Sequence, residues 1–278
     1  MPAAPVSVVI PTFNRCESVL KAIASVQQQS LPAAQIVVVD DGSTDNTVEQ
    51  IRLRFPDVQL LRQDNAGVSS ARNLGMRAST QPWIALLDSD DRWFNNKLEI
   101  QMNAIAANEG CVLCHCDEIW IRNGTRVNPM NKHRKRGGFI FEHCLPLCAI
   151  SPSAVVMRRS LLEHLGWFDE SLPACEDYDL WLRICSQHPV LFVDQALLEK
   201  TGGHEDQLSR KHWGMDRFRL QALAKLLRSN TLSAEQQQLA QTVFSRKFGI
   251  LVKGAKKRNN QAFIAELHQQ YTDLAGSN

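Results

Sequence analysis

The sequence lacks several features that would assign it to a class at once. It has no G-x-G-x-x-G and no P-loop, so a dinucleotide-dependent or ATP-cleaving protein loses its main support. Internal repeats and low-complexity tracts are absent. No secretory signal is visible, and the longest charge-free run near the middle, residues 143–157, is too short to span a bilayer. We therefore expect a cytoplasmic protein whose eight cysteines are thiols.

The composition is that of an ordinary globular protein, with 44% hydrophobic and 22% charged residues in a chain of 278. The net charge of +2 conceals an asymmetry. Residues 201–278 carry 12 Lys/Arg against 6 Asp/Glu, whereas residues 1–200 carry 19 against 23. The basic tail suits an anionic surface, so peripheral contact with the inner face of a membrane is one expectation. A solvated face of lysines is the alternative.

Four short apolar runs open the chain, at residues 6–11, 35–41, 58–63 and 83–90. They are apolar enough to be buried on both faces, and helical patterns lie between them. Alternation of strands and helices predicts an α/β fold with a Rossmann-like, mostly parallel sheet flanked by helices.

The pattern changes after a helix predicted near residues 95–107. Strands are predicted at 111–121 and 153–159, with a long irregular piece at 122–139 between them. From about residue 213 the pattern is helical to the end. The expected organisation is an α/β body over 1–212, with two halves over 1–107 and 108–212, followed by a helical extension over 213–278.

Polar residues gather where the predicted parallel strands end, which is the edge of such a sheet where ligands bind. Five of them are aspartates, and clustered carboxylates are tolerable when a hard cation such as Mg²⁺ or Mn²⁺ neutralises them. Such a cation normally shares its other positions with substrate phosphates, so a metal–diphosphate is the expected ligand. For residues 40–43 a simple turn with a helix cap remains the alternative. The residues concerned are Thr12, Asn14, Arg15, Asp40, Asp41, Asp88, Asp90 and Asp91.

Five motifs stand in a fixed order along the chain: VSVVIPTFNR, VVVDDGSTDNT, NAGVSSARNLG, LLDSDDRW and CEDYDLWLR. Together they resemble the nucleotide-sugar-dependent glycosyltransferases of family 2, which have the GT-A fold. The resemblance covers roughly residues 5–210 and implies a nucleotide-binding half over 1–107 and an acceptor-binding half over 108–212. The helical tail matches no family that we can name.

The resemblance implies roles for individual residues. The substrate-binding residues it implies are Thr12, Arg15, Asp40, Asp41, Arg72, Asp88 and Glu176. Asp88-Ser89-Asp90 resembles the D-x-D motif of the family, with Asp90 as the direct metal ligand and Asp88 on the ribose or a metal-bound water. Asp91 is expected either to take part in this D-x-D site or to bond the backbone of the loop and shape it. Asp177 resembles the general base, although an acidic first turn of a helix is the alternative.

Two further groups of residues have open interpretations. The cysteines and histidines at 111–116 and 143–148 could form a zinc site, but alternation along a strand would separate Cys111 from Cys114, and free cysteine is readily buried. His204 follows two glycines and is expected as a metal ligand, a diphosphate contact or a loop residue. The basic stretch 131–138 suits an anionic acceptor or a solvated loop.

The resemblance thus predicts an inverting, metal-dependent hexosyltransferase that uses Mn²⁺ or Mg²⁺. The expected donor is a UDP-sugar, and the expected acceptor is a saccharide or lipid-linked intermediate of surface polysaccharide or glycolipid synthesis. No nucleic-acid partner is expected. The rival interpretations are a nucleotidyltransferase, which should have a Gly-rich basic loop that PTFNRCES lacks, and a non-catalytic sugar-nucleotide binder.

Overall fold

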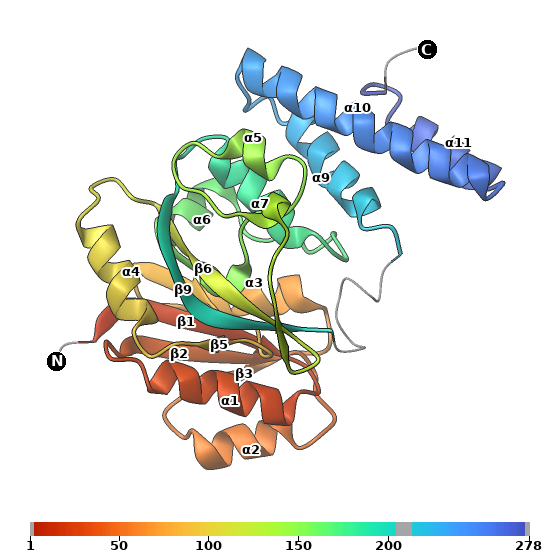
Figure 1. Cartoon of the computed structure of the whole chain (residues 1–278). Helices are drawn as coiled ribbons and strands as arrows, with labels where there is room; N and C mark the ends of the chain where they lie inside the picture. The colour runs from red at the N-terminus through yellow and green to blue at the C-terminus, as the bar shows by residue number, and fades with distance from the viewer. Residues whose placement is uncertain (1–2, 204–212, 276–278) are drawn as a thin grey trace.

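A computed structural model describes residues 3–203 and 213–275 of the chain. Within these residues one mixed sheet of nine strands crosses the molecule in the order β3-β2-β1-β4-β8-β6-β9-β5, and β7 pairs with β6 outside this path. Figure 1 shows helices α1 and α2 at one end of the molecule and α9, α10 and α11 at the other, with the sheet between them.

The first half of the sheet is parallel. It consists of β1 (Ala4–Thr12), β2 (Ala33–Asp40), β3 (Gln59–Arg62) and β4 (Trp83–Leu86). Alternate side chains of β1 enter apolar clusters on opposite faces of the sheet, because a strand points successive residues in opposite directions. Burial on both faces accounts for the continuous apolar runs in the sequence.

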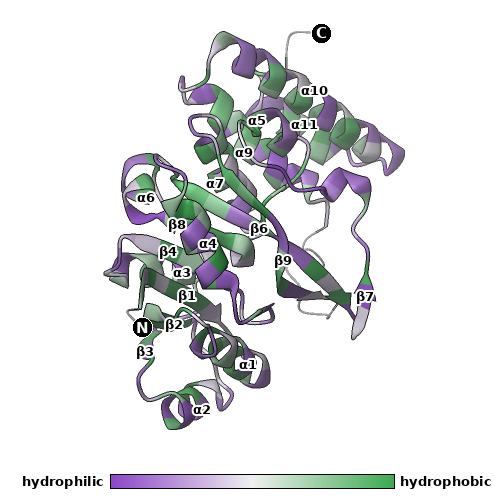
Figure 2. Ribbon diagram, turned by 60° about the vertical axis from the view of Figure 1, so that its left-hand side comes forward, coloured by the Kyte–Doolittle hydropathy of each residue, from purple (hydrophilic) through white to green (hydrophobic). Residues whose placement is uncertain are grey.

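The connecting helices cover this half as the sequence predicts. They are α1 (Cys16–Gln27), α2 (Thr47–Arg54), α3 (Val68–Ala78) and α4 (Lys97–Ala106). The predicted stripe on α1, with Val19, Ile23 and Val26, is buried against the strands. Figure 2 shows the hydrophobic residues of β1 and β4 at the centre and hydrophilic residues on the outer side of α2.

The second half of the sheet is mixed. The strands β6 (Leu113–Arg122) and β8 (Val155–Arg158) confirm the two predicted strands, and β8 joins β4 antiparallel. A third long strand, β9 (Leu191–Gly202), runs parallel to β6 and was not predicted. The short β5 (Arg92–Trp93) and β7 (Thr125–Val127) complete the sheet by antiparallel pairing.

Short helices lie over the second half. They are η1 (Asn131–His133), α5 (Phe141–Cys144), η2 (Pro152–Ala154) and α6 (Arg159–Leu165), followed by the longer α7 (Glu176–Cys185). The helix predicted for the motif CEDYDLWLR is therefore present, and it buries Leu180, Trp181 and Ile184.

The C-terminal part is helical, as predicted, with α9 (Asp216–Arg228), α10 (Ala234–Lys257) and α11 (Gln261–Gln270). These helices share one apolar cluster with α7, which includes Tyr178, Leu223 and Phe244. Over the described ranges, no helix is long and apolar enough to cross a membrane. The predicted GT-A-type α/β architecture is confirmed, whereas the domain boundaries at 107 and 212 stay predictions.

Candidate active site

Thr12 and Asp40 end adjacent strands and lie opposite each other in the register of β1 and β2. The Asp40 carboxylate is fully buried, accepts a hydrogen bond from Ser43 N at 3.1 Å and lies 3.3 Å from Arg62 Nε. Thr12 Oγ1 is buried and has no hydrogen-bond partner among residues 3–203 and 213–275. A buried hydroxyl of this kind favours a polar group of a ligand. Next to it, the ring of Phe13 is 43% exposed, a residue that we did not predict for the site.

Asp41 organises a loop. Its Oδ1 accepts hydrogen bonds from Gln63 Nε2 at 2.7 Å and Ala66 N at 2.9 Å. Its Oδ2 accepts from Gly67 N at 2.9 Å and Asn65 Nδ2 at 3.2 Å. Both carboxylate oxygens therefore hold the turn that precedes α3, so a substrate contact of Asp41 stays a prediction.

Arg72 connects two of the predicted motifs. Its side chain is 4% exposed, and its guanidinium donates to Asp88 Oδ1 and to Glu176 Oε1, each at 2.6 Å. Burial alone would lower the pKa of Arg72, but these two carboxylates raise it. Arg72 Nε is buried without a partner, and the guanidinium lies 5.2 Å from the centre of the Phe168 ring.

The pKa values of the two carboxyl groups that Arg72 bonds shift in opposite directions. Burial would raise the pKa of Asp88, but the charge of Arg72 holds it below the usual value. For Glu176, burial and the neighbouring Asp177 outweigh Arg72 and raise the pKa.

The three carboxylates that follow β4 have three different partners. Asp88 pairs with Arg72, and Asp90 Oδ2 lies 2.8 Å from Arg15 Nη1. Asp91 is buried and accepts from Ser153 Oγ at 2.6 Å and from Thr201 N at 2.8 Å. The fold tolerates three neighbouring aspartates because each carboxylate bonds different groups.

Asp91 is a loop-forming residue, which was one of its two predicted roles. Its bond to Thr201 N ties the D-x-D loop to β9, while Ser153 Oγ also accepts from Asp88 N at 3.0 Å. Burial, followed by the charges of Asp90 and Asp88, raises the pKa of Asp91. The loop is thereby fixed in the sheet.

Asp88 and Asp90 offer oxygen ligands, which suit a hard cation such as Mg²⁺ or Mn²⁺. No group of three His, Cys, Asp or Glu residues that could hold a metal ion occurs in the part of the chain that the structure describes. Asp88 and Asp90 therefore suit a cation that binds one or two protein carboxylates and takes its other ligands from phosphates. The third predicted ligand, His204, lies outside the described residues.

Asp177 stands in the first turn of α7 and is partly exposed. Its Oδ1 accepts from Tyr178 N at 2.7 Å, and its Oδ2 lies 3.2 Å from the Cys148 thiol. Burial and the charge of Asp177 raise the pKa of Cys148, so the thiol keeps its proton. A carboxylate at a helix N-terminus is favoured electrostatically.

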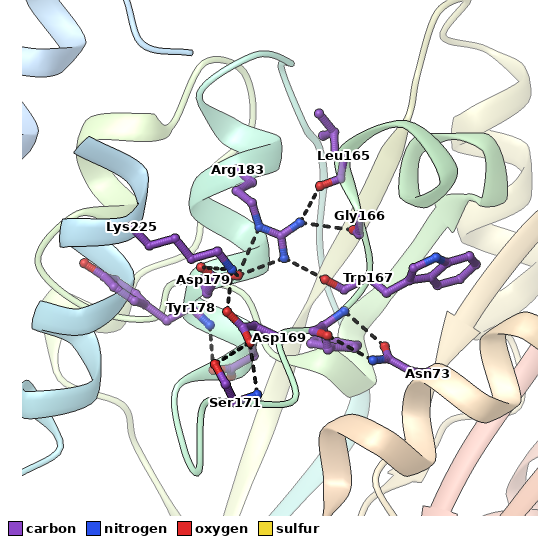
Figure 3. Close-up of polar contacts among 12 residues, drawn as sticks. Asn73, Leu165, Gly166, Trp167, Asp169, Ser171, Tyr178, Asp179, Arg183 and Lys225 are labelled. Atoms are coloured by element: carbon purple, nitrogen blue, oxygen red, sulfur yellow. Dashed lines mark hydrogen bonds and ion pairs between the residues drawn. The ribbon is translucent and has the colours of Figure 1, made fainter. Parts of the chain in front are cut away.

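The helix that carries Asp177 is fixed by a polar network (Figure 3). Arg183 donates to Asp179 Oδ2 and to the carbonyl oxygens of Leu165, Gly166 and Trp167 at 2.7–3.0 Å. Lys225 of α9 also bonds Asp179, at 3.2 Å. These contacts tie α7 to the segment after α6 and to α9.

A cleft of about 560 Å³ opens beside the N-terminus of α1. Of the residues predicted at the strand ends, Asn14, Arg15 and Asp90 line it; Arg72 and Asp177 are not among its lining residues. The remaining lining comes mainly from α1 and from the ends of β5 and β9, including Lys21, Arg92 and Thr201. The predicted residues at the ends of β1, β2 and β4 thus lie at one edge of the sheet, and Arg72 links the loop after β4 to α7.

The cysteines form no disulfide or zinc site among the described residues. Cys114 and Cys116 are buried apolar residues, and burial raises the pKa of Cys114 to about 12. His115 between them is buried as well, and its pKa falls to about 3 because burial disfavours the imidazolium. These groups are part of the core.

The sequence model described as "Glycosyl transferase family 2" matches residues 7–166. The UDP-Glc:alpha-D-GlcNAc-diphosphoundecaprenol beta-1,3-glucosyltransferase WfgD of Escherichia coli is 32% identical over 192 residues, which are 68% of this chain and 73% of that protein. An uncharacterized glycosyltransferase of Rickettsia bellii is 33% identical over 188 residues, which are 66% of this chain. The chain spans only 27–35% of the length of three Rickettsia relatives.

Two solved structures resemble the fold at low sequence identity. S. aureus TarS 1-349 in complex with UDP-GlcNAc is similar with a TM-score of 0.70 and 18% identity, over 87% of this chain and 71% of TarS. The mannosyltransferase PcManGT from Pyrobaculum calidifontis, in complex with GDP-Man and Mn²⁺, has a TM-score of 0.61 and 16% identity, over 95% of this chain and 79% of that one. At such identities the likeness shows the fold alone.

Proposed function

The chain belongs to glycosyl transferase family 2, and on that premise we propose that it transfers a hexose from a UDP-sugar to an acceptor hydroxyl with inversion at the anomeric carbon. The observation that carries the proposal is the Arg72 bridge. It joins Asp88, on the predicted donor side, to Glu176, the neighbour of the predicted base Asp177. One buried cation thereby sets the distance between the two halves of a transfer site.

The donor base would occupy the ends of β1 and β2. A uracil N–H can donate to the Asp40 carboxylate, and the unpartnered Thr12 Oγ1 lies opposite it in the register. The exposed ring of Phe13 offers a stacking surface, which is sequence-tolerant because every base has a π-face. A UDP-sugar is also the donor in the name of WfgD and the ligand in the TarS complex.

The donor diphosphate would lie at the D-x-D loop. Asp88 and Asp90 are the residues that would hold Mn²⁺ or Mg²⁺, and Arg15, beside Asp90, supplies a further positive charge there. The bound metal would stabilise the negative charge of the departing diphosphate. PcManGT, which shares the fold, is described in complex with Mn²⁺.

Asp177 is the proposed general base. Its carboxylate takes the proton of the acceptor hydroxyl while that oxygen forms a bond to the anomeric carbon. The bond from this carbon to the diphosphate oxygen breaks, and its electron pair leaves with the diphosphate. A single displacement of this kind, through an oxocarbenium-like transition state, inverts the configuration. The Cys148 thiol and Tyr178 N orient the base without removing its negative charge.

The proposed acceptor is a saccharide or a lipid-linked intermediate of surface polysaccharide or glycolipid synthesis. The name of WfgD contains such a diphosphoundecaprenol acceptor. Basic side chains at the end of β6 and on the segment after it, among them Arg122, Lys132 and Arg136, are exposed and suit an anionic acceptor of that chemistry.

We further propose peripheral contact with an anionic membrane through α10. Arg246, Ile250, Lys253 and Lys257 are exposed and recur at i, i+4, i+7 and i+11, which places them on one side of the helix. Ile250 is 55% exposed in the middle of this basic stripe. Each basic residue near an anionic surface contributes about 1 kcal/mol to binding.

Vesicle sedimentation tests this contact. Because α9 and α10 share the core with α7, charge reversal of Lys253 and Lys257 to Glu is preferable to truncation. The variant should lose binding to vesicles with anionic lipids, and wild-type binding should fall with salt. Equal sedimentation of both proteins, or binding that ignores salt, contradicts the contact.

A thermal-shift panel of UDP- and GDP-sugars, with Mn²⁺ or with EDTA, tests the function. A UDP-sugar plus Mn²⁺ should raise the melting temperature, since a ligand at 100 times its Kd adds about 2.7 kcal/mol to the stability of the folded state. The Asp40→Ala variant serves as the control and should show no shift. A wild-type protein that responds to no nucleotide sugar contradicts the proposed function.

A further inference from the structure

One lysine at the candidate site forms no ion pair with a carboxylate of the described residues. Lys200 lies near the end of β9, is partly exposed, and donates one hydrogen bond from Nζ to Ser151 Oγ at 3.0 Å. Among the described residues it takes part in no ion pair within 4.0 Å. An ammonium has three protons to donate, so two of them have no acceptor within the described part of the chain.

Lys200 nevertheless stays charged. Burial alone would lower its pKa, but Glu118, Asp91, Asp88 and Asp177 together raise it. Two of these carboxylates belong to the proposed site, Asp88 on the donor side and Asp177 as the proposed base.

The Glu118 carboxylate bonds Ser151, as Lys200 does, and it already has other hydrogen-bond donors. Its Oε1 accepts from Trp120 Nε1 at 2.7 Å and from Ser151 Oγ at 2.9 Å, and its Oε2 accepts from Lys135 Nζ at 2.7 Å. Burial would raise the pKa of Glu118, but Lys135 and Lys200 lower it to about 2. Lys135 therefore balances this carboxylate, and the charge of Lys200 is left for another anion.

The backbone beside Lys200 is fixed to the D-x-D loop. Thr201 N donates to Asp91 Oδ1 at 2.8 Å. Glu199 of β9 lies opposite Arg92 of β5 in the antiparallel register. The ammonium is thus held at the loop that would receive the donor diphosphate, and ordering it on binding costs little entropy.

Resting on the proposed function, we propose that Lys200 binds the diphosphate of the nucleotide-sugar donor through its two remaining Nζ protons. A diphosphate is the anion that the proposed reaction brings to this loop, whereas the attacking hydroxyl is neutral. A fixed ammonium there also stabilises the oxygen that receives the electron pair when the bond to the anomeric carbon breaks. The competing role is a structural counter-charge for the surrounding carboxylates.

Binding of UDP and of uridine, measured by ligand-observed NMR titration in EDTA, separates the two roles. Lys200→Gln keeps a donor for Ser151 and removes the charge, while Lys200→Arg keeps the charge. For Lys200→Gln we expect UDP affinity to fall about 10- to 100-fold, the range of one charge-assisted hydrogen bond, and uridine affinity to stay unchanged. Lys200→Arg should recover most of the UDP affinity. Lys256→Gln, which removes an exposed lysine on α10, is the matched control and should bind both ligands as wild type does.

Unchanged UDP affinity in Lys200→Gln overturns the inference. An equal loss of UDP and uridine affinity overturns it too, because it indicates a structural counter-charge. In both cases the proposed function stands, since wild type binds UDP. A wild-type protein that binds neither UDP nor uridine contradicts the proposed donor and the role of Lys200 together.

Discussion

Replacement of Arg72 by Met tests the bridge between the two halves of the site. The substitution keeps most of the apolar stem and removes the guanidinium that bonds Asp88 and Glu176 at 2.6 Å. Removing one partner of a buried ion pair typically costs about 3–5 kcal/mol, because a charge is left buried and uncompensated. Glu176, whose side chain is 6% exposed, stays buried, whereas Asp88 at 25% regains some hydration. We therefore expect a loss of about 3 kcal/mol in the free energy of unfolding at pH 7.

The loss should depend on pH in a defined direction. In wild type, Arg72 holds the pKa of Asp88 down, so its contribution to stability is present above the unfolded pKa and is lost as pH falls. In Arg72→Met both carboxyl groups gain protons more readily, and a neutral carboxyl costs less to bury. The difference between variant and wild type should shrink as pH is lowered from 7 toward 4.

Urea denaturation of wild type, Arg72→Met and Arg77→Met provides the measurement. Arg77 lies on the same helix, is 56% exposed, and approaches Glu170 only to 3.9 Å, so its loss should change stability by less than about 0.5 kcal/mol. If Arg72→Met lies within 1 kcal/mol of wild type at pH 7, or if its deficit grows at low pH, the bridge is not the buried ion pair that we describe.

Three further substitutions address other parts of the molecule. Lys97 is fully buried against the Trp93 ring, and burial lowers its pKa to about 8; Lys97→Met should therefore raise stability at pH 7 by about 1–3 kcal/mol. Because the folded pKa lies below the unfolded one, wild-type stability should rise between pH 8 and 10.5, and a destabilised Lys97→Met would refute this. Cys148→Ser keeps a donor to Asp177 Oδ2 and should keep most of the transfer rate, whereas Cys148→Ala removes that donor and should lower kcat at an unchanged donor Kd; equal rates for the two variants contradict the orienting role of Cys148. Asp90→Asn should abolish the effect of Mn²⁺ on nucleotide binding and leave the melting temperature nearly unchanged, and a variant that keeps wild-type Mn²⁺ dependence excludes Asp90 as a ligand.

Much of the first half was predictable because its strands are buried on both faces and its helices carry clear apolar stripes. β9 was missed because Asp194, Gln195, Glu199 and Lys200 interrupt its pattern, and its pairing with β6 contains register shifts. A strand of this kind is held by its neighbours more than by its own propensity.

The candidate site shows the same division. The aspartates at the strand ends were visible in the sequence, but their partners were not, because Asp91 bonds Thr201 at a separation of 110 residues and Arg72 bonds Glu176 at 104. Of the adjacent Asp40 and Asp41, the sequence cannot tell which one holds the loop. For Phe13 the sequence did contain a signal, namely an aromatic residue directly after a buried strand. That signal is consistent with the base-stacking role that we propose for it.

The central claim is that Asp177 takes the proton of the acceptor hydroxyl. The most direct test measures the transfer rate and the donor Kd on one variant, Asp177→Asn, which keeps the shape of the side chain but cannot accept a proton at neutral pH. General-base catalysis contributes about 10²–10⁴-fold, so the rate should fall by that factor while the donor Kd stays as in wild type. Near-normal transfer by Asp177→Asn, or a loss of donor binding that accounts for the lost rate, would contradict Asp177 as the base.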